Sequence, residues 1–150
     1  MATMHVRRAV KHDLDAINFL MENSSAYDGQ YRRILQGYAV TEQQVLSDHI
    51  FVAVASAEIL GFYSLVAEKG ELDLMFVSDR AQGGGVGAAL FNHMAELAFG
   101  LKISAVRIVS HPPAAEFYTR MGARRIGTLP GKGKVTWDRP ILEYSVRSHA

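Results

Sequence analysis

The sequence VSDRAQGGGVGA, residues 77–88, links an apolar segment to an amphipathic one. Its three adjacent glycines, with a fourth two positions later, exceed what a turn between a strand and a helix needs. Glycine allows sharp turns with positive φ and leaves no side chain between the backbone amides and a ligand. The first N–H groups of a helix are unpaired and its dipole favours negative charge, so the segment predicts a diphosphate-binding loop. A flexible turn that only ends the strand is the alternative.

Two common phosphate-binding loops do not fit this segment. A P-loop ends in Gly-Lys followed by Ser or Thr, whereas this loop ends in Val86-Gly87-Ala88. Gly83, Gly85 and Ala88 do match the Gly-x-Gly-x-x-Ala pattern of dinucleotide-binding folds. That pattern needs a carboxylate about 20 residues on, and residues 105–110 read AVRIVS. The segment also follows several strands in succession, so both alternatives are rejected.

The sequence around the loop predicts a mixed α/β fold. Three stretches rich in β-branched and aromatic residues predict a meander of strands over residues 50–55, 59–66 and 72–77. A helix is expected after Gly87 and a second short one from Pro112 or Pro113, because proline is tolerated in a first turn. The remaining strands after the loop are expected over residues 103–109, 125–128 and 141–146.

The N-terminal third is expected to add one strand and two helices. Residues 5–9 suit a strand, and Asp13 is predicted to cap the helix that follows. Thr41 and Gln44 match a capping box, which predicts the start of a second helix. Residues 23–38 are less regular. The expected architecture is therefore a mixed, mostly antiparallel sheet flanked by helices.

Composition narrows the class of protein. A chain of 150 residues with 49% apolar residues predicts one globular domain, residues 1–150. The net charge of +1 gives no reason to expect nucleic acid or a membrane surface as a partner. The absence of cysteine removes disulfides, a thiolate nucleophile and thiolate metal ligands, and fits a cytoplasmic location. Residues 1–10 lack a signal peptide's apolar region, and neither a membrane span nor a metal is expected.

Two motifs resemble the GNAT superfamily of acetyl-CoA-dependent N-acetyltransferases. Residues 82–87, QGGGVG, match its signature of Arg or Gln, two residues, Gly, one residue, then Gly or Ala. Residues 117–122, FYTRMG, match the Phe-Tyr-x-x-x-Gly that often follows some thirty residues later. The resemblance extends at motif level from Leu72 to Arg125.

The resemblance implies a binding mode for acetyl-CoA. In this superfamily the loop amides hold the pyrophosphate, and the strand before the loop splays from a parallel neighbour and pairs with the pantetheine arm. The loop residues so implied are Gln82, Gly83, Gly84, Gly85, Val86, Gly87 and Ala88. The strand residues so implied are Met75, Phe76 and Val77, whose side chains can equally belong to the core.

Tyr118 corresponds to the superfamily's tyrosine on the helix after the splayed strand. A thiol titrates near ~8.5 and a phenol near ~10, so tyrosine is protonated at neutral pH and can supply a proton or hydrogen bond to a departing thiolate. We therefore expect Tyr118 to be catalytic. A half-buried tyrosine packed beside Phe117 is the alternative.

A general base is useful because an amine is mostly protonated at pH 7. Glu71 and Asp73 bracket the start of the splayed strand, and alternation places both on one face. Asp73 is the better candidate; a solvated or substrate-binding carboxylate is the alternative. His111, after the next strand, is a second candidate, for which a structural role is favoured.

Two regions bear on the substrates. Similar sequences often carry an asparagine that contacts the coenzyme where this chain has Pro113, which has no N–H to donate. The acceptor pocket is expected from Tyr27, Tyr31, Tyr38 and the region Trp137-Asp138-Arg139, since aromatics with nearby carboxylates suit a cationic amine. Ordinary packing is the alternative for these aromatic residues.

The predicted activity is transfer of an acetyl group from acetyl-CoA to a primary amine by direct attack, with a small-molecule acceptor. No covalent intermediate is expected, because cysteine and a Gly-x-Ser-x-Gly elbow are absent. A protein or peptide N-acetyltransferase and a non-catalytic acyl-CoA sensor are the alternatives. Relatives frequently dimerise through C-terminal strands, which leaves a homodimer as an open expectation.

Overall fold

The computed structural model describes residues 3–147. Residues 1–2 and 148–150 lie outside the described part. The first two belong to residues 1–10, the segment that lacks the apolar region of a signal peptide. The strands are β1 (His5–Arg8), β2 (His49–Ala55), β3 (Glu58–Val66), β4 (Glu71–Val77), β5 (Ala105–Val109), β6 (Arg124–Leu129) and β7 (Arg139–Ser145). The helices are α1 (Leu14–Glu22), α2 (Glu42–Ser47), α3 (Val86–Gly100) and α4 (Ala115–Arg120). This order confirms the predicted mixed fold.

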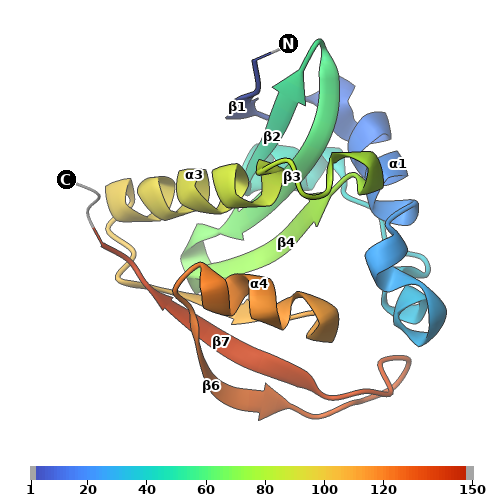
Figure 1. Cartoon of the computed structure of the whole chain (residues 1–150), viewed down its shortest axis with the longest axis vertical. Helices are drawn as coiled ribbons and strands as arrows, with labels where there is room; N and C mark the ends of the chain where they lie inside the picture. The colour runs from blue at the N-terminus through green and yellow to red at the C-terminus, as the bar shows by residue number, and fades with distance from the viewer. Residues whose placement is uncertain (1–2, 148–150) are drawn as a thin grey trace.

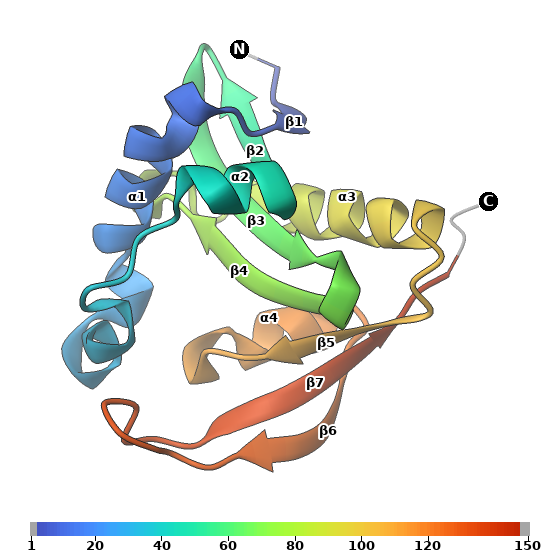
Figure 2. The ribbon, with the colours of Figure 1, turned by 180° about the vertical axis from the view of Figure 1, so that it is seen from behind.

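The seven strands form one sheet in the order β1-β2-β3-β4-β5-β7-β6. Every neighbouring pair in the described chain is antiparallel except β4 and β5, which run parallel. These two strands lie close at one end and diverge towards the other (Figure 2). The sheet is therefore split into two halves, as the resemblance to the GNAT superfamily implied.

Helices cover both faces of the sheet. α3 and α4 lie on the face seen in Figure 1, with α3 over the N-terminal half and α4 over the C-terminal half. α1 and α2 lie on the opposite face, as Figure 2 shows. Each face has its own core: Leu90 and Met94 of α3 are fully buried on one side, and Ile17 and Met21 of α1 on the other.

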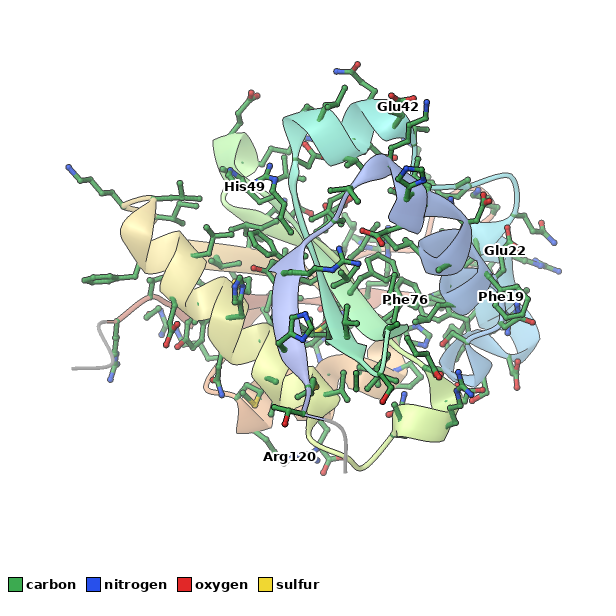
Figure 3. All side chains as sticks on the ribbon, turned by 90° about the horizontal axis from the view of Figure 1, so that it is seen from above. Phe19, Glu22, Glu42, His49, Phe76 and Arg120 are labelled. Carbon is green, nitrogen blue, oxygen red and sulfur yellow. The ribbon has the colours of Figure 1, made fainter. Side chains whose placement is uncertain are left out.

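Phenylalanine residues of β4 and α1 differ in burial according to the side of their element that faces the core. Phe76 of β4 is 4% exposed and lies in the interior, whereas Phe19 of α1 is 68% exposed and points outward (Figure 3). Phe62 stacks on Phe76 at 5.6 Å between ring centroids. β4 is thus anchored on one side by an aromatic core.

A β-bulge interrupts β4 at Asp73. Leu72 pairs with Leu65 of β3 and Leu74 pairs with Ser64, so Asp73 has no partner on β3. Leu72 consequently packs in the core beneath α3 and α4, while Leu74 packs in the opposite core. Because a bulge increases local twist and bends its strand, it turns β4 just where this strand leaves β5.

One local prediction needs correction. α1 does begin after Asp13, but the side chain of Asp13 does not cap it. Its carboxylate instead accepts two hydrogen bonds from the Arg7 guanidinium, at 2.8 and 2.9 Å, and one from the Val10 N–H at 2.8 Å. α3 ends at Gly100, and the chain turns at Lys102, whose φ is +62°. The capping box of Thr41 and Gln44 is present as predicted.

We predict that Asp13→Asn lowers the free energy of unfolding by about 1–3 kcal/mol, because it weakens a charge-assisted contact at a buried position. The hydrogen bond from Arg7 is the main reason that the pKa of Asp13 is lowered from 3.8. A lowered folded-state pKa gives stability that is complete above pH 3.8 and is lost as pH falls through the folded-state value.

Denaturant titrations from pH 7 downward check this prediction: the gap between wild type and Asp13→Asn should shrink below pH 3.8. Asp15→Asn is the matched control, since Asp15 is exposed on α1. An equal loss in both variants would contradict the assignment.

Candidate active site

The divergence of β4 and β5 opens a cleft with a volume of ≈ 460 Å³. Its walls come from β4, the glycine loop and the start of α3 on one side, and from the end of β5 and α4 on the other. β4 and β5 pair at a single position, Glu71 with Arg107. Beyond it the edge of β4 that faces β5 has no strand partner, so its backbone groups are open to a ligand.

The glycine loop meets this cleft with unpaired amides. Gly85 is the N-cap of α3 at φ +81°, and Gly83 has φ +80°, conformations that glycine adopts without strain. The first hydrogen bond of the helix runs from the Ala89 N–H to the Gly85 carbonyl at 3.0 Å. The amides of Val86, Gly87 and Ala88 precede it, so they are available to an anion.

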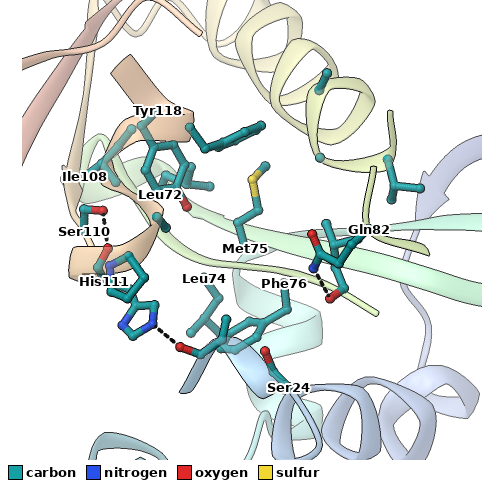
Figure 4. A pocket seen from close by; sticks show the side chains of 18 of the residues that line it. Ser24, Leu72, Leu74, Met75, Phe76, Gln82, Ile108, Ser110, His111 and Tyr118 are labelled. Carbon is teal, nitrogen blue, oxygen red and sulfur yellow. Dashed lines mark hydrogen bonds between the residues drawn. The ribbon is translucent and has the colours of Figure 1, made fainter. Parts of the chain in front are cut away.

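The fold brings the residues that the resemblance implies for coenzyme binding to the walls of the cleft, with one exception. Of the ten residues, Gly84 alone does not line the cleft; its N–H donates to the Ala81 carbonyl at 3.3 Å. Gln82 lines the cleft, but its side-chain amide donates to the Val77 carbonyl at 3.1 Å and braces the loop against β4. In Figure 4 the side chain of Met75 points into the cleft, whereas that of Phe76 lies on the other side of β4.

Tyr118 of α4 extends into the same cleft (Figure 4). Its side chain is held by Phe117 and Phe91, with ring centroids 5.3 and 6.2 Å away. Burial, with a smaller contribution from Tyr27, raises the pKa of Tyr118. The hydroxyl therefore stays protonated at neutral pH and is a donor directed towards the cleft.

His111 stands at the end of β5 within a wall of aromatic rings. It stacks on Tyr27 at 3.9 Å and 9° and meets Tyr31 edge-on at 4.7 Å. Its Nε2 donates to the Ala26 carbonyl, so Nδ1 is the unprotonated nitrogen of the neutral ring. Burial lowers the pKa of His111, which keeps the ring neutral at pH 7. This geometry gives His111 a structural role in holding residue 26 over the cleft.

Asp73 lies at the bulge and lines the cleft. Burial raises the pKa of Asp73, and the charges of Glu71 and Asp48 raise it further, against the effect of Lys69. A carboxylate whose pKa is raised is a better proton acceptor at neutral pH than an ordinary one. Asp73 is itself exposed, so its carboxylate is open to a group in the cleft.

A second cavity of ≈ 220 Å³ adjoins the cleft, and Asp73 and His111 line both. Tyr27 also lines both, and the remaining wall of the second cavity includes Tyr38, Trp137 and Arg139. All four residues come from the regions in which the sequence predicted the acceptor pocket. Tyr31 does not line it but supports it, edge-on to Trp137 at 5.0 Å. Asp138 does not line it either; its carboxylate accepts the Gly131 N–H at 2.9 Å.

Sequence reasoning missed several lining residues. Ile34 and Leu35 of the second cavity and Ser24 and Ala26 of the cleft come from residues 24–35, which form short 3-10 turns. Such turns have neither the helical nor the strand period, so no pattern predicted which side chains point inward. Pro113 lines the cleft at the position where relatives often carry asparagine.

Residues 24–133 match the protein family described as "Acetyltransferase (GNAT) domain". This match spans well over half of the chain and agrees with the fold and the cleft. The chain therefore belongs to the GNAT acetyltransferase family. No sequence among the curated proteins matches it.

Solved structures share the whole fold at low sequence identity. A GCN5-related N-acetyltransferase from Rhodopseudomonas palustris is 17% identical, with 97% of each chain covered and a TM-score of 0.77. The ribosomal-protein-S18-alanine N-acetyltransferase from Escherichia coli is 13% identical, with 99% and 97% covered and a TM-score of 0.73. Ard1 from Thermoplasma volcanium is 17% identical, with 97% and 99% covered and a TM-score of 0.76. At these identities the comparisons establish the fold alone.

The family implies acetyl-CoA as cosubstrate, and the cleft fits it. The unpaired amides at the start of α3 suit a pyrophosphate, and the open edge of β4 suits the amides of a pantetheine arm. Within residues 3–147, no three His, Cys, Asp or Glu side chains gather as metal ligands. No helix in the described part of the chain is long and apolar enough to span a bilayer.

We predict that Gly85→Ala weakens acetyl-CoA binding roughly tenfold, because a left-handed backbone costs a residue with Cβ about 1–2 kcal/mol and displaces the amides that follow. Calorimetric titration measures this affinity. Gly100→Ala at the other end of α3 is the matched control. It should leave affinity unchanged and stabilise the helix by up to about 1 kcal/mol. Equal affinity in both variants would exclude the loop from binding.

Proposed function

We propose that the protein is an N-acetyltransferase that moves the acetyl group of acetyl-CoA to the primary amine of a small molecule. The observation that carries the proposal is the shared wall of the two cavities. Asp73 and His111 line both the cleft that fits acetyl-CoA and the adjoining cavity. An amine in the second cavity would therefore meet a thioester in the cleft beside a carboxylate.

The proposed reaction has one bond-forming and one bond-breaking event at the thioester carbonyl. The amine nitrogen forms a bond to the carbonyl carbon, the carbon–sulfur bond breaks, and the electron pair leaves with the sulfur. Asp73 accepts the proton that the amine must lose, and Tyr118 donates a proton to the departing thiolate. A neutral amine loses one proton and the sulfur gains one, whereas an ammonium first releases one further proton to solvent, so the reaction balances without a metal or an oxidant.

The positions of these two groups support their roles. Asp73 lies at the junction with the second cavity, where an acceptor would approach. Tyr118 reaches the cleft from α4, on the opposite side of the split from the glycine loop. Direct transfer fits this arrangement, because the chain has no cysteine that could carry the acetyl group.

The form of the second cavity favours a small acceptor over a polypeptide. It is lined by residues of the 3-10 turns, β4, β5 and the start of β7, and its volume is ≈ 220 Å³. A peptide N-terminus is the competing acceptor. A thiol-release assay that compares small amines with short peptides decides between them.

We predict that Tyr118→Phe lowers kcat by about 10²- to 10⁴-fold, because the leaving sulfur loses its proton donor while the ring still fills its place. The affinity for acetyl-CoA in a calorimetric titration should not change. Tyr144→Phe is the matched control, since Tyr144 packs against Phe91 and lines neither cavity. Full activity in Tyr118→Phe would refute the assignment, and binding without turnover on any amine would favour a sensor.

We predict that kcat at saturating acceptor falls as pH drops through the raised pKa of Asp73, because the base must be ionised to accept a proton. Asp73→Asn should lower kcat and remove this fall at low pH, the acid limb of the pH profile. His111→Gln should retain the limb, because His111 is assigned a structural role. A limb that survives in Asp73→Asn and disappears in His111→Gln would transfer the role of base to His111.

A further inference from the structure

Two unpaired N–H groups belong to side chains that line the second cavity. In residues 3–147, the buried side-chain polar atoms without a protein hydrogen-bond partner are Trp137 Nε1, Arg139 Nε and Ser64 Oγ. Trp137 and Arg139 both line the second cavity, whereas Ser64 lies within β3. A buried donor without an acceptor costs about 1–3 kcal/mol. Because both side chains line the second cavity, we infer that a ligand in it supplies the missing acceptors.

The charge of Arg139 also has no ion-pair partner among residues 3–147. The ion pairs of the described residues all involve other side chains. The neighbouring carboxylate of Asp138 is turned to the loop, where it accepts the Gly131 N–H. Burial raises the pKa of Tyr27 to about 12, and the positive charge of Arg139 opposes this rise. A guanidinium is always protonated in proteins, so the cavity wall carries a positive charge that no carboxylate of the described residues pairs with.

The same cavity carries a negative group that Arg139 does not neutralise. Asp73 lines it, and no ion pair joins Asp73 to Arg139. A ligand with an ammonium group and an oxyanion would meet both charges. A polyamine would meet Asp73 alone and leave the donors of Arg139 and Trp137 without acceptors.

We propose that the acceptor is an amino carboxylate, whose amine lies towards Asp73 and whose carboxylate is held by Arg139 and Trp137. The role of the amine as acetyl acceptor rests on the proposed function. The recognition of the carboxylate rests on the second cavity alone. The planar guanidinium matches the two oxygens of a carboxylate, and the indole N–H adds a third donor.

The single tryptophan of the chain provides a direct measurement. Trp137 is 9% exposed and lines the second cavity, so its fluorescence reports a ligand there. The probes are glycine, β-alanine and γ-aminobutyrate, each paired with its primary amide, titrated into the full chain with saturating coenzyme A. The carboxylates should bind roughly 10- to 100-fold more tightly than their amides, because the amides lack the charge that Arg139 recognises.

Substitutions locate the selectivity. Arg139→Gln should bring the affinities of each carboxylate and its amide to within about threefold, while coenzyme A binding in a calorimeter stays unchanged. Arg33→Gln is the matched control, since Arg33 is exposed and lines neither cavity; it should behave as wild type. Trp137→Phe, followed by calorimetry, removes one donor and keeps a ring beside Tyr31, so a smaller loss of the preference is expected.

The two proposals fail in different ways. Equal binding of carboxylates and amides to the wild type, or a preference that survives in Arg139→Gln, overturns carboxylate recognition even if amines are acetylated. Selective carboxylate binding without thiol release from any amine overturns acetyl transfer and leaves the carboxylate site in place. Thiol release that follows the same carboxylate preference, and loses it in Arg139→Gln, supports both.

Discussion

The separation of β4 from β5 after one paired position is the constraint on which the rest of the site depends. Glu71 and Arg107 are joined in the ladder, and the N–H of Arg107 also donates to the Gly70 carbonyl at 2.8 Å. Beyond that point, backbone groups that a continuous sheet would satisfy face a cleft. Unpaired backbone groups in a protein interior are costly, so such an opening persists only where solvent or a ligand can satisfy them. The bulge at Asp73 bends β4 where the opening begins.

The segment over residues 24–35 closes the open side, and contacts from both halves of the split sheet hold it. The carboxylate of Asp79, just after β4, accepts the Ser25 N–H at 3.1 Å. From the other half, His111 donates to the Ala26 carbonyl and stacks on Tyr27. A segment of short 3-10 turns, with no α-helix or strand, is thus fixed over both cavities. The tyrosine rings that line or support the second cavity owe their positions to these contacts.

The two cavities differ in the groups that they offer to a ligand. The cleft presents backbone groups, from the start of α3 and the edge of β4, which suit the phosphates and amides of acetyl-CoA. The second cavity presents side chains: Asp73, Arg139 and a set of aromatic rings. Backbone recognition tolerates sequence change, whereas side-chain recognition does not. This difference fits a fold shared by solved structures that are 13–20% identical in sequence.

The sequence by itself determined the order of elements, the glycine loop and the helix that carries Tyr118, because each depends on local periodicity or on residues adjacent in the chain. It did not determine that Asp13 pairs with Arg7, that Gly84 is turned out of the cleft, or that Asp73 occupies a bulge. Nor did it show that Arg139 lines a cavity and has no ion-pair partner in the part of the chain that the structure describes. These features depend on contacts between residues distant in the chain, such as His111 with Ala26, 85 positions apart, and only the packed structure brings such residues together.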